Sequence, residues 1–164
     1  MPGEKEVNVI IRPAAAEDAD AAAEMVGELL NEIMQASGVQ AFHFDLPDTT
    51  ERIRHFLQRG HYTVFIAVDT TAGKNVGLLT LTESHALYAE GAFGILPEFY
   101  IRPTHRSRGI GKRLLDTARE YALSKGWKRL EVATPPVPAF DRTLTFYEAN
   151  GYTSTGGRKL KIVL

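Results

Sequence analysis

The residues with the clearest chemistry lie in a short segment at residues 101–112, IRPTHRSRGIGK. Gly109 and Gly111 allow the backbone to approach a ligand closely, and a helical pattern of apolar residues begins directly there. The first turn of a helix leaves about four amide donors unpaired, and these donors attract phosphate oxygens. Between Arg102 and Arg113 the chain carries five cationic side chains and no acidic one: Arg102, Arg106, Arg108, Lys112 and Arg113. These features predict an anion-binding turn; the alternative is a strand-to-helix turn with a solvated basic face.

The turn matches neither of two common nucleotide-binding motifs. A Walker A loop requires glycine at position 106 and Ser or Thr at position 113, where this chain has Arg106 and Arg113. A dinucleotide-binding fingerprint that starts at Gly109 requires a further glycine at position 114, which is Leu114. The sequence therefore predicts an anion held in some other way than by these motifs.

The turn does fit a different pattern. Residues 106–111 (RSRGIG) match Arg/Gln-x-x-Gly-x-Gly/Ala, and here the sequence resembles the GNAT superfamily of N-acetyltransferases. Ile101 and Pro103 before the turn, and residues 146–152 (FYEANGY), also fall where that family places such residues, so the resemblance extends over residues 7–152. It implies an α/β (α+β) fold in which a mixed, mostly antiparallel sheet with splayed central strands is flanked by helices.

The resemblance also implies acetyl-CoA as co-substrate and assigns residues to it. The turn would wrap the pyrophosphate through Arg106, Ser107, Arg108, Gly109, Ile110, Gly111 and Lys112. The pantetheine arm would lie in a V-shaped cleft and pair with the backbone of Phe99, Tyr100 and Ile101, opposite residues 130–132. The family often has Asn seven residues before its catalytic tyrosine, where this chain has Phe140. The contacts with the cofactor at that position must therefore differ from those of the family, and Phe140 and Arg142 are the candidates for making them.

Acetylation of an amine needs a base for the ammonium, whose pKa is about 10 if lysine-like, and benefits from an acid for the departing thiolate. By resemblance, Tyr147 protonates or hydrogen-bonds the leaving sulfur; alternatively it is a core aromatic beside Phe146. Glu98 lies five residues before Pro103, where many relatives carry an acid, and could serve as the base. The alternatives are that Glu98 pairs with a nearby arginine or that water alone removes the proton. The chain has no Cys, which excludes an acetyl-cysteine intermediate and favours direct transfer in a ternary complex.

The remaining sequence predicts the elements that position these residues. Strands are expected at residues 7–11, 62–68, 76–82, 93–101 and 128–133, with one or two more within 152–164. Helices are expected after Asp18, after a capping box at residues 48–51, from Ile110 to Lys125, and over residues 142–149. Pro97 interrupts the strand over 93–101, and a bulge is favoured over an edge position. Without repeats or a linker, residues 1–164 are expected to form a single N-acetyltransferase domain.

A formal net charge of -1 conceals an uneven distribution of charge. Nine acidic residues and no Lys or Arg lie between Pro13 and Glu51: Glu17, Asp18, Asp20, Glu24, Glu28, Glu32, Asp45, Asp48 and Glu51. This segment could attract a cationic amine as one wall of the acceptor site. Alternatively, it is a solvated helical face.

The other expectations concern partners and location. No metal is expected, because the five His form no His-Glu-x-x-His motif and Cys is absent. Nucleic acid is disfavoured, because no aromatics are interleaved with the basic residues. No apolar run approaches the roughly 20 residues of a bilayer span, and no signal peptide is visible, so a cytoplasmic protein without membrane contact is expected.

Two functions remain: an N-acetyltransferase for a primary amine of a small molecule or peptide, as a monomer or a homodimer, and a non-catalytic acyl-CoA-binding or sensing domain. The presence of Tyr147 favours the enzyme.

Overall fold

The computed structural model describes residues 8–135 and 140–164 of the chain. Contacts divide the chain into two compact units, with the boundary between Ala133 and Thr134. The first unit holds the sheet and three α-helices, and the second holds the C-terminal helix. The single domain expected over residues 1–164 stays a prediction. Within the described residues, no helix has both the length and the apolar character that a membrane span requires.

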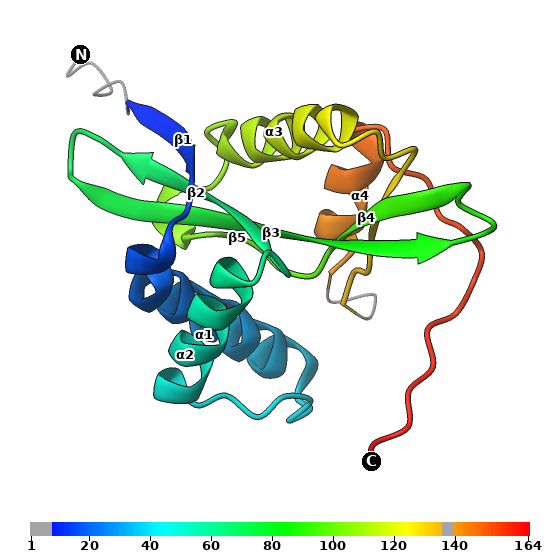
Figure 1. Ribbon diagram of the computed structural model, residues 1–164. Coiled ribbons are helices and arrows are strands. Elements are labelled where there is room, and N and C mark those ends of the chain that lie inside the picture. Colours follow the sequence, from blue (N-terminus) through cyan, green and yellow to red (C-terminus); the bar gives the residue numbers. More distant parts are fainter. Residues whose placement is uncertain (1–7, 136–139) are drawn as a thin grey trace. The chain divides into compact units, whose positions relative to one another are not determined.

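The first unit consists of a sheet with helices on both faces (Figure 1). Its strands are β1 (Val9–Pro13), β2 (Thr63–Asp69), β3 (Lys74–Ala86), β4 (Gly91–Leu96), β5 (Phe99–Ile101) and β6 (Leu130–Val132). Its helices are α1 (Ala19–Ser37), α2 (Leu46–Gln58) and α3 (Ile110–Ser124), with single 3-10 turns η1 (Ala16–Asp18) and η2 (Pro103–His105). Helices α1 and α2 lie on one face of the sheet, and α3 lies on the other.

The sheet is antiparallel except at one pair of strands. Its order is β1-β2-β3-β4-β6, with β5 paired to β3 beside this path. Strands β4 and β6 run parallel, and the other pairs run antiparallel. The predicted mixed, mostly antiparallel sheet flanked by helices is confirmed. The predicted hairpin of residues 62–82 is the β2–β3 pair, and β3 continues four residues further than predicted, to Ala86.

The strand expected over residues 93–101 is two strands separated by Pro97 and Glu98. Both pair with β3: β4 along residues 82–86 and β5 along residues 77–79. On its other side β4 pairs with β6 as far as Leu96, whereas the described pairings of β5 are with β3 alone. Proline has no N–H to donate to a ladder, which accounts for the interruption at this point. The pairing of β6 with this side of the sheet therefore ends at Leu96, where β4 ends.

The core forms where the predicted apolar faces of the helices meet the sheet. In α1 the buried residues include Ala22 and Val26, and in α3 they include Ile110, Leu114 and Ala118. Each set recurs at three- to four-residue spacing, which puts it on one side of its helix. The α1 residues join buried side chains of β2 and β3 in one apolar cluster. This packing holds α1 and the central strands in a defined register.

Two local predictions are wrong. Helix α2 is capped by Asp45, whose carboxylate accepts a hydrogen bond from the Asp48 amide at 2.9 Å, and not by Asp48. Pro47 lies in the first turn of the helix, where its missing N–H costs no hydrogen bond, so the helix begins earlier than expected. Residues 152–164 contain no strand. The apolar residues at 160–164 favour a strand there, but a strand also needs a partner to pair with.

Candidate functional site

The predicted phosphate-binding turn connects β5 to α3 in the first unit. Ser107 and Gly109 have left-handed backbone conformations, with φ of 62° and 77°. Gly109 is the N-cap of α3, and the first helical hydrogen bond runs from the Arg113 amide to its carbonyl at 3.2 Å. A Cβ at Gly109 would meet nothing within 4 Å, so backbone conformation rather than crowding favours glycine there. The amides of residues 110–112 precede this first bond and have no intrahelical acceptor.

Four of the five cationic side chains of the turn are exposed: Arg106, Arg108, Lys112 and Arg113. Lys112 Nζ contacts Asp116 Oδ2 at 2.8 Å, one helical turn along. Ile110 is buried, so only its main chain can contact a ligand. Exposed positive charge and early helix amides therefore occur together in this turn, as an anion-binding site requires.

Arg102 and Arg106 bind acidic side chains of α1. The Arg106 guanidinium contacts both carboxylate oxygens of Glu32, at 3.0 and 2.7 Å, and its Nε donates to the Ile101 carbonyl at 2.9 Å. Arg102 binds both carboxylate oxygens of Glu28, at 3.1 and 2.9 Å. These bidentate pairs join α1 to both sides of η2. Because the Arg106 side chain is engaged in this way, its contact with a cofactor would be through the main chain.

The acidic segment between Pro13 and Glu51 is thus largely committed to contacts within the fold. Five of its nine acids contact arginines, with Asp18 near Arg12, Glu24 and Glu28 near Arg102, Glu32 near Arg106, and Glu51 near Arg54. Asp45 caps α2. Six of the nine acidic side chains that could attract a cationic acceptor are therefore already engaged within the fold.

Glu98 lies at the interruption between β4 and β5, where its carboxylate is held by two hydroxyls. Oε1 accepts a hydrogen bond from Tyr62 at 3.3 Å, and Oε2 accepts one from Thr80. The Thr80 oxygen in turn accepts from the Glu98 amide at 3.0 Å, and the Thr80 amide donates to the Glu98 carbonyl at 2.9 Å. Among the described residues no Lys or Arg pairs with Glu98, contrary to one alternative considered from the sequence.

The surroundings of Glu98 also change its proton affinity. Burial raises the pKa of the Glu98 carboxyl above its ordinary value of 4.5, and the hydrogen bonds from Thr80 and Tyr62 partly offset this rise. Burial, followed by the charge of Glu98, raises the pKa of Tyr62, so the phenol keeps its proton and remains a donor. Sequence reasoning missed both hydroxyl partners. One signal was present: Thr80 is a polar residue within an apolar strand segment, and such a buried hydroxyl needs a partner.

The three residues predicted to pair with pantetheine make up β5. Their backbone pairs with β3 on one side, in the register Gly77↔Ile101 to Leu79↔Phe99. Tyr100 and Ile101 are buried, and the Tyr100 hydroxyl donates to Glu28 at 3.4 Å. Along the chain Glu98 directly precedes this strand, and the turn directly follows it. The first unit therefore brings together one predicted catalytic residue and most predicted cofactor contacts.

The remaining predicted site residues belong to the second unit and its helix α4 (Asp141–Ala149). Phe140 is the N-cap of this helix, and Arg142 is exposed in its first turn. Tyr147 is buried, and its ring lies 5.8 Å from that of Phe146 and 5.5 Å from that of Tyr152. Burial, with a smaller effect of Tyr152, raises the pKa of Tyr147, so its phenol holds a proton at neutral pH. The grouping of Tyr147, Phe140 and Arg142 with Glu98 stays a prediction.

Most of these elements lie in a part of the chain that matches a known family. Residues 60–154 match the Acetyltransferase (GNAT) domain. The chain belongs to the GNAT family. The GNAT match covers more than half of the chain and includes both the turn and Tyr147. The resemblance inferred from the sequence is confirmed, and so is the prediction of an acetyltransferase enzyme.

The GNAT assignment agrees with named relatives. One is the uncharacterized N-acetyltransferase YhfO of Bacillus subtilis (strain 168), 29% identical over 147 residues, or 90% of this chain and 91% of that protein. A second is the structure of the aminoglycoside acetyltransferase meta-AAC0020, from an uncultured soil metagenomic sample, in complex with sisomicin. It has a TM-score of 0.75 and 18% identity, and the match covers 95% of this chain and 96% of that one.

A third relative is the structure of a predicted acetyltransferase with acetyl-CoA from Clostridium acetobutylicum. Its TM-score is 0.72 at 15% identity, and the match covers 95% of this chain and 96% of that one. Structures with sequence identities this low are evidence for the fold alone, and here they confirm the GNAT fold predicted for this chain.

Among the described residues, no group of three or more His, Asp and Glu side chains could hold a metal ion.

Proposed function

We propose that this GNAT enzyme transfers the acetyl group of acetyl-CoA to a primary amine of a small molecule or peptide, by direct attack in a ternary complex. The observation that carries this proposal is the environment of Glu98. It is a largely buried carboxylate with a raised pKa, held by two hydroxyls and paired with no cation among the described residues. Such a group can accept a proton from an ammonium ion, as the nucleophilic amine requires.

The turn before α3 fits the diphosphate of acetyl-CoA. Arg108 and Arg113 are exposed, the first amides of α3 lack intrahelical acceptors, and Gly109 leaves open space beside them. Ser107, Gly111, Lys112 and the main chain of Arg106 and Ile110 complete the proposed set. When bound, acetyl-CoA supplies the acetyl group as an activated thioester. The Clostridium relative with acetyl-CoA supports this choice of co-substrate.

The residues of the chain have separate proton roles in this proposal. Glu98 takes a proton from the acceptor ammonium, directly or through a water, while Tyr62 and Thr80 hold its carboxylate in place. Tyr147 donates a proton to the sulfur as the C–N bond forms and the C–S bond breaks, so coenzyme A leaves as the thiol. The second proton that the nitrogen loses restores the phenol. The GNAT match runs across the boundary at Ala133, which supports one functional domain made of both units. The related aminoglycoside acetyltransferase makes small-molecule amines the first acceptors to test.

Coenzyme A is expected to raise the melting temperature of the protein. At about 100 times its Kd, a ligand adds roughly 2.7 kcal/mol of stability, which corresponds to a rise of roughly 5–10 °C for a chain of this size. The double variant Arg108→Ala/Arg113→Ala, which lacks two exposed cations of the turn, should require more coenzyme A for the same rise in melting temperature. Differential scanning fluorimetry measures both. An unchanged melting temperature at millimolar coenzyme A would contradict the enzyme and the binding-domain functions alike.

Acetyl transfer itself is tested by release of free thiol from acetyl-CoA across a panel of amines. The panel contains aminoglycosides, polyamines, amino acids and peptides with free N-termini. We expect amine-dependent thiol release with at least one of these classes, and mass spectrometry should show an acetyl group on the amine nitrogen. If coenzyme A binds but no amine supports release, the non-catalytic acyl-CoA-binding function is favoured instead.

A further inference from the structure

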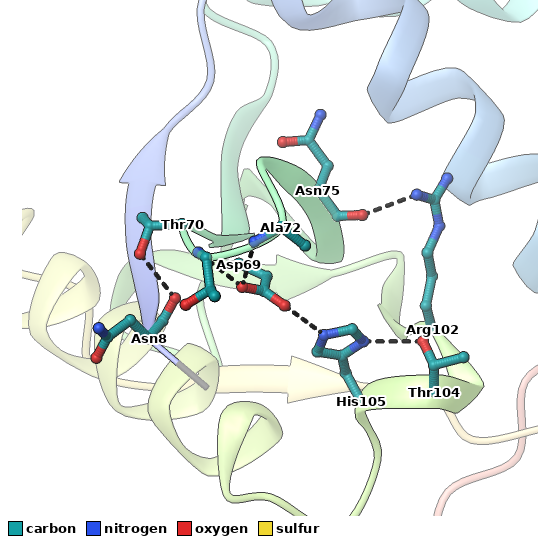
Figure 2. Close-up of polar contacts among 9 residues, drawn as sticks. Asn8, Asp69, Thr70, Ala72, Asn75, Arg102, Thr104 and His105 are labelled. Atoms are coloured by element: carbon teal, nitrogen blue, oxygen red, sulfur yellow. Dashed lines mark hydrogen bonds and ion pairs between the residues drawn. The ribbon is translucent and has the colours of Figure 1, made fainter. Parts of the chain in front are cut away.

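Asp69 and His105 form a largely buried pair that has no role in the function proposed above (Figure 2). Asp69 ends β2, and its side chain is 7% exposed; that of His105, in η2, is 14% exposed. Asp69 Oδ2 lies 2.9 Å from His105 Nε2. The other oxygen of Asp69, Oδ1, accepts from the amides of Thr71 at 2.9 Å and Ala72 at 3.1 Å. One carboxylate thus binds both the β2–β3 loop and the segment that leads into the phosphate turn.

The hydrogen bonds determine which atom of the pair carries the proton. The hydrogen bond from His105, followed by that from the Ala72 amide, holds the pKa of Asp69 below its usual range, so the carboxylate only accepts. His105 Nε2 must therefore carry a hydrogen and donate it to Asp69. The opposite ring atom, Nδ1, lies 2.8 Å from Thr104 Oγ1, which donates to it when the ring is neutral. Both ring nitrogens are engaged, which holds the imidazole in one orientation.

Apolar packing does little to hold the segment between β5 and α3. Thr104, Arg106, Ser107, Arg108 and Gly109 are all exposed. Polar contacts hold it instead. The Arg102 amide donates to the Val76 carbonyl, and Arg102 Nη1 donates to the Asn75 carbonyl, each at 2.8 Å. The His105–Asp69 pair is the next contact along the chain, directly before the turn motif begins at Arg106 (Figure 2).

We propose that Asp69 and His105 are positioning residues for the phosphate turn: they fix η2 against the β2–β3 loop, so that the turn holds its binding conformation before acetyl-CoA arrives. This inference rests on the proposed role of the turn in binding acetyl-CoA. A turn that is ordered only upon binding loses conformational entropy at that moment, and this loss weakens affinity. The pair acts on cofactor binding and not on the proton transfers at the acetyl group.

The test compares variants that break or keep the pair. His105→Ala removes the donor and leaves the Asp69 carboxylate without it, so we expect KM for acetyl-CoA to rise roughly 10-fold with kcat little changed. Asp69→Asn should have a similar effect, because its one carbonyl oxygen is needed by the Thr71 and Ala72 amides, which leaves the NH2 group, a donor, facing the N–H of Nε2. His105→Gln retains an N–H about as far along the side chain, and it should restore most of the affinity. The double variant should be no worse than either single one, since both remove the same contact.

The matched control is Thr70→Ala. Thr70 belongs to the same loop, and its hydroxyl donates to the Asn8 carbonyl at 3.0 Å, away from the turn (Figure 2). This variant loosens the loop and leaves the pair in place, so KM for acetyl-CoA should not change. A KM increase equal to that of His105→Ala would overturn the positioning role, because general loosening of the loop would then explain both.

Two measurements without cofactor separate this inference from the proposed function. Amide hydrogen exchange over residues 103–112 should accelerate in His105→Ala and Asp69→Asn but not in Thr70→Ala. The imidazole ¹⁵N spectrum of the wild type should show His105 with a hydrogen on Nε2. If the wild type fails to bind coenzyme A, the proposed function fails, whatever the exchange shows. If the wild type binds and folded His105→Ala binds equally well with unchanged exchange, the positioning inference is wrong.

Discussion

Replacement of Glu98 by Gln is expected to lower kcat/KM for amine acetylation by about 10²- to 10⁴-fold, the usual contribution of a positioned general base. The substitution keeps the size of the side chain. Its carbonyl oxygen can still accept from Thr80, and its NH2 group can donate to the Tyr62 oxygen instead, so the fold should be preserved. Only the ability to take a proton is lost. Initial rates of thiol release, measured with the acceptor found in the amine panel, give the ratio.

The pH dependence of the same reaction supplies a second readout. Glu98 must be ionised to accept a proton, so activity falls as pH drops through its pKa. Because burial raises that pKa, the acidic limb of kcat/KM should lie above the ordinary value of 4.5. The hydrogen bond from Tyr62 lowers the pKa of Glu98, so Tyr62→Phe should move the limb to higher pH, and Glu98→Gln should abolish it.

An alternative source of such a limb is the acceptor amine itself. Acceptors that differ in amine pKa separate the two, because a limb set by Glu98 keeps its position when the acceptor changes. If Glu98→Gln retains near wild-type kcat/KM and the same profile, water removes the proton, and Glu98 is a structural residue of the strand interruption.

Replacement of Tyr147 by Phe is expected to lower kcat by about 10²-fold or more, with little change in KM for acetyl-CoA. Phe keeps the ring contacts with Phe146 and Tyr152, so the loss reflects the hydroxyl alone. An acetyl thioester with a more acidic thiol needs less help from an acid, so the difference between wild type and variant should shrink with such a substrate. Rates with acetyl-CoA and with an acetyl aryl thioester measure this.

The matched control for Tyr147 is Tyr152→Phe, which removes a hydroxyl from the neighbouring ring of the same unit. This variant should retain wild-type kcat. If Tyr147→Phe is also fully active while its melting temperature falls, Tyr147 is a core aromatic, as the alternative considered from the sequence holds.

The elements predicted most accurately are those specified by local patterns. Helix α3 begins at Ile110, between the two glycines of the turn, and the β2–β3 hairpin follows its apolar runs and turn residues. The predictions that failed depend on more than pattern. Asp45 and Asp48 both suit an N-cap, and only the path of the chain before α2 selects Asp45. The apolar residues at 160–164 suit a strand, but pattern alone cannot supply a pairing partner.

The sequence by itself determined the chemistry of the turn and the family. Two glycines, five cations and a helix start within 13 residues are local features, and they suffice to predict an anion site. The absence of Cys likewise excludes a cysteine intermediate without any structure. These conclusions need no knowledge of distant partners, because each depends on residue type and short spacing alone.

Only the tertiary structure decided what surrounds the reactive groups. Glu98 meets Tyr62 and Thr80, which lie 36 and 18 residues away, and Arg106 meets Glu32, 74 residues away. His105 meets Asp69 across 36 residues. The physical reason is that burial and charge depend on neighbours in space. The α1 glutamates meet arginines, whereas Glu98 meets two hydroxyls at a largely buried position, and this burial raises the pKa of Glu98.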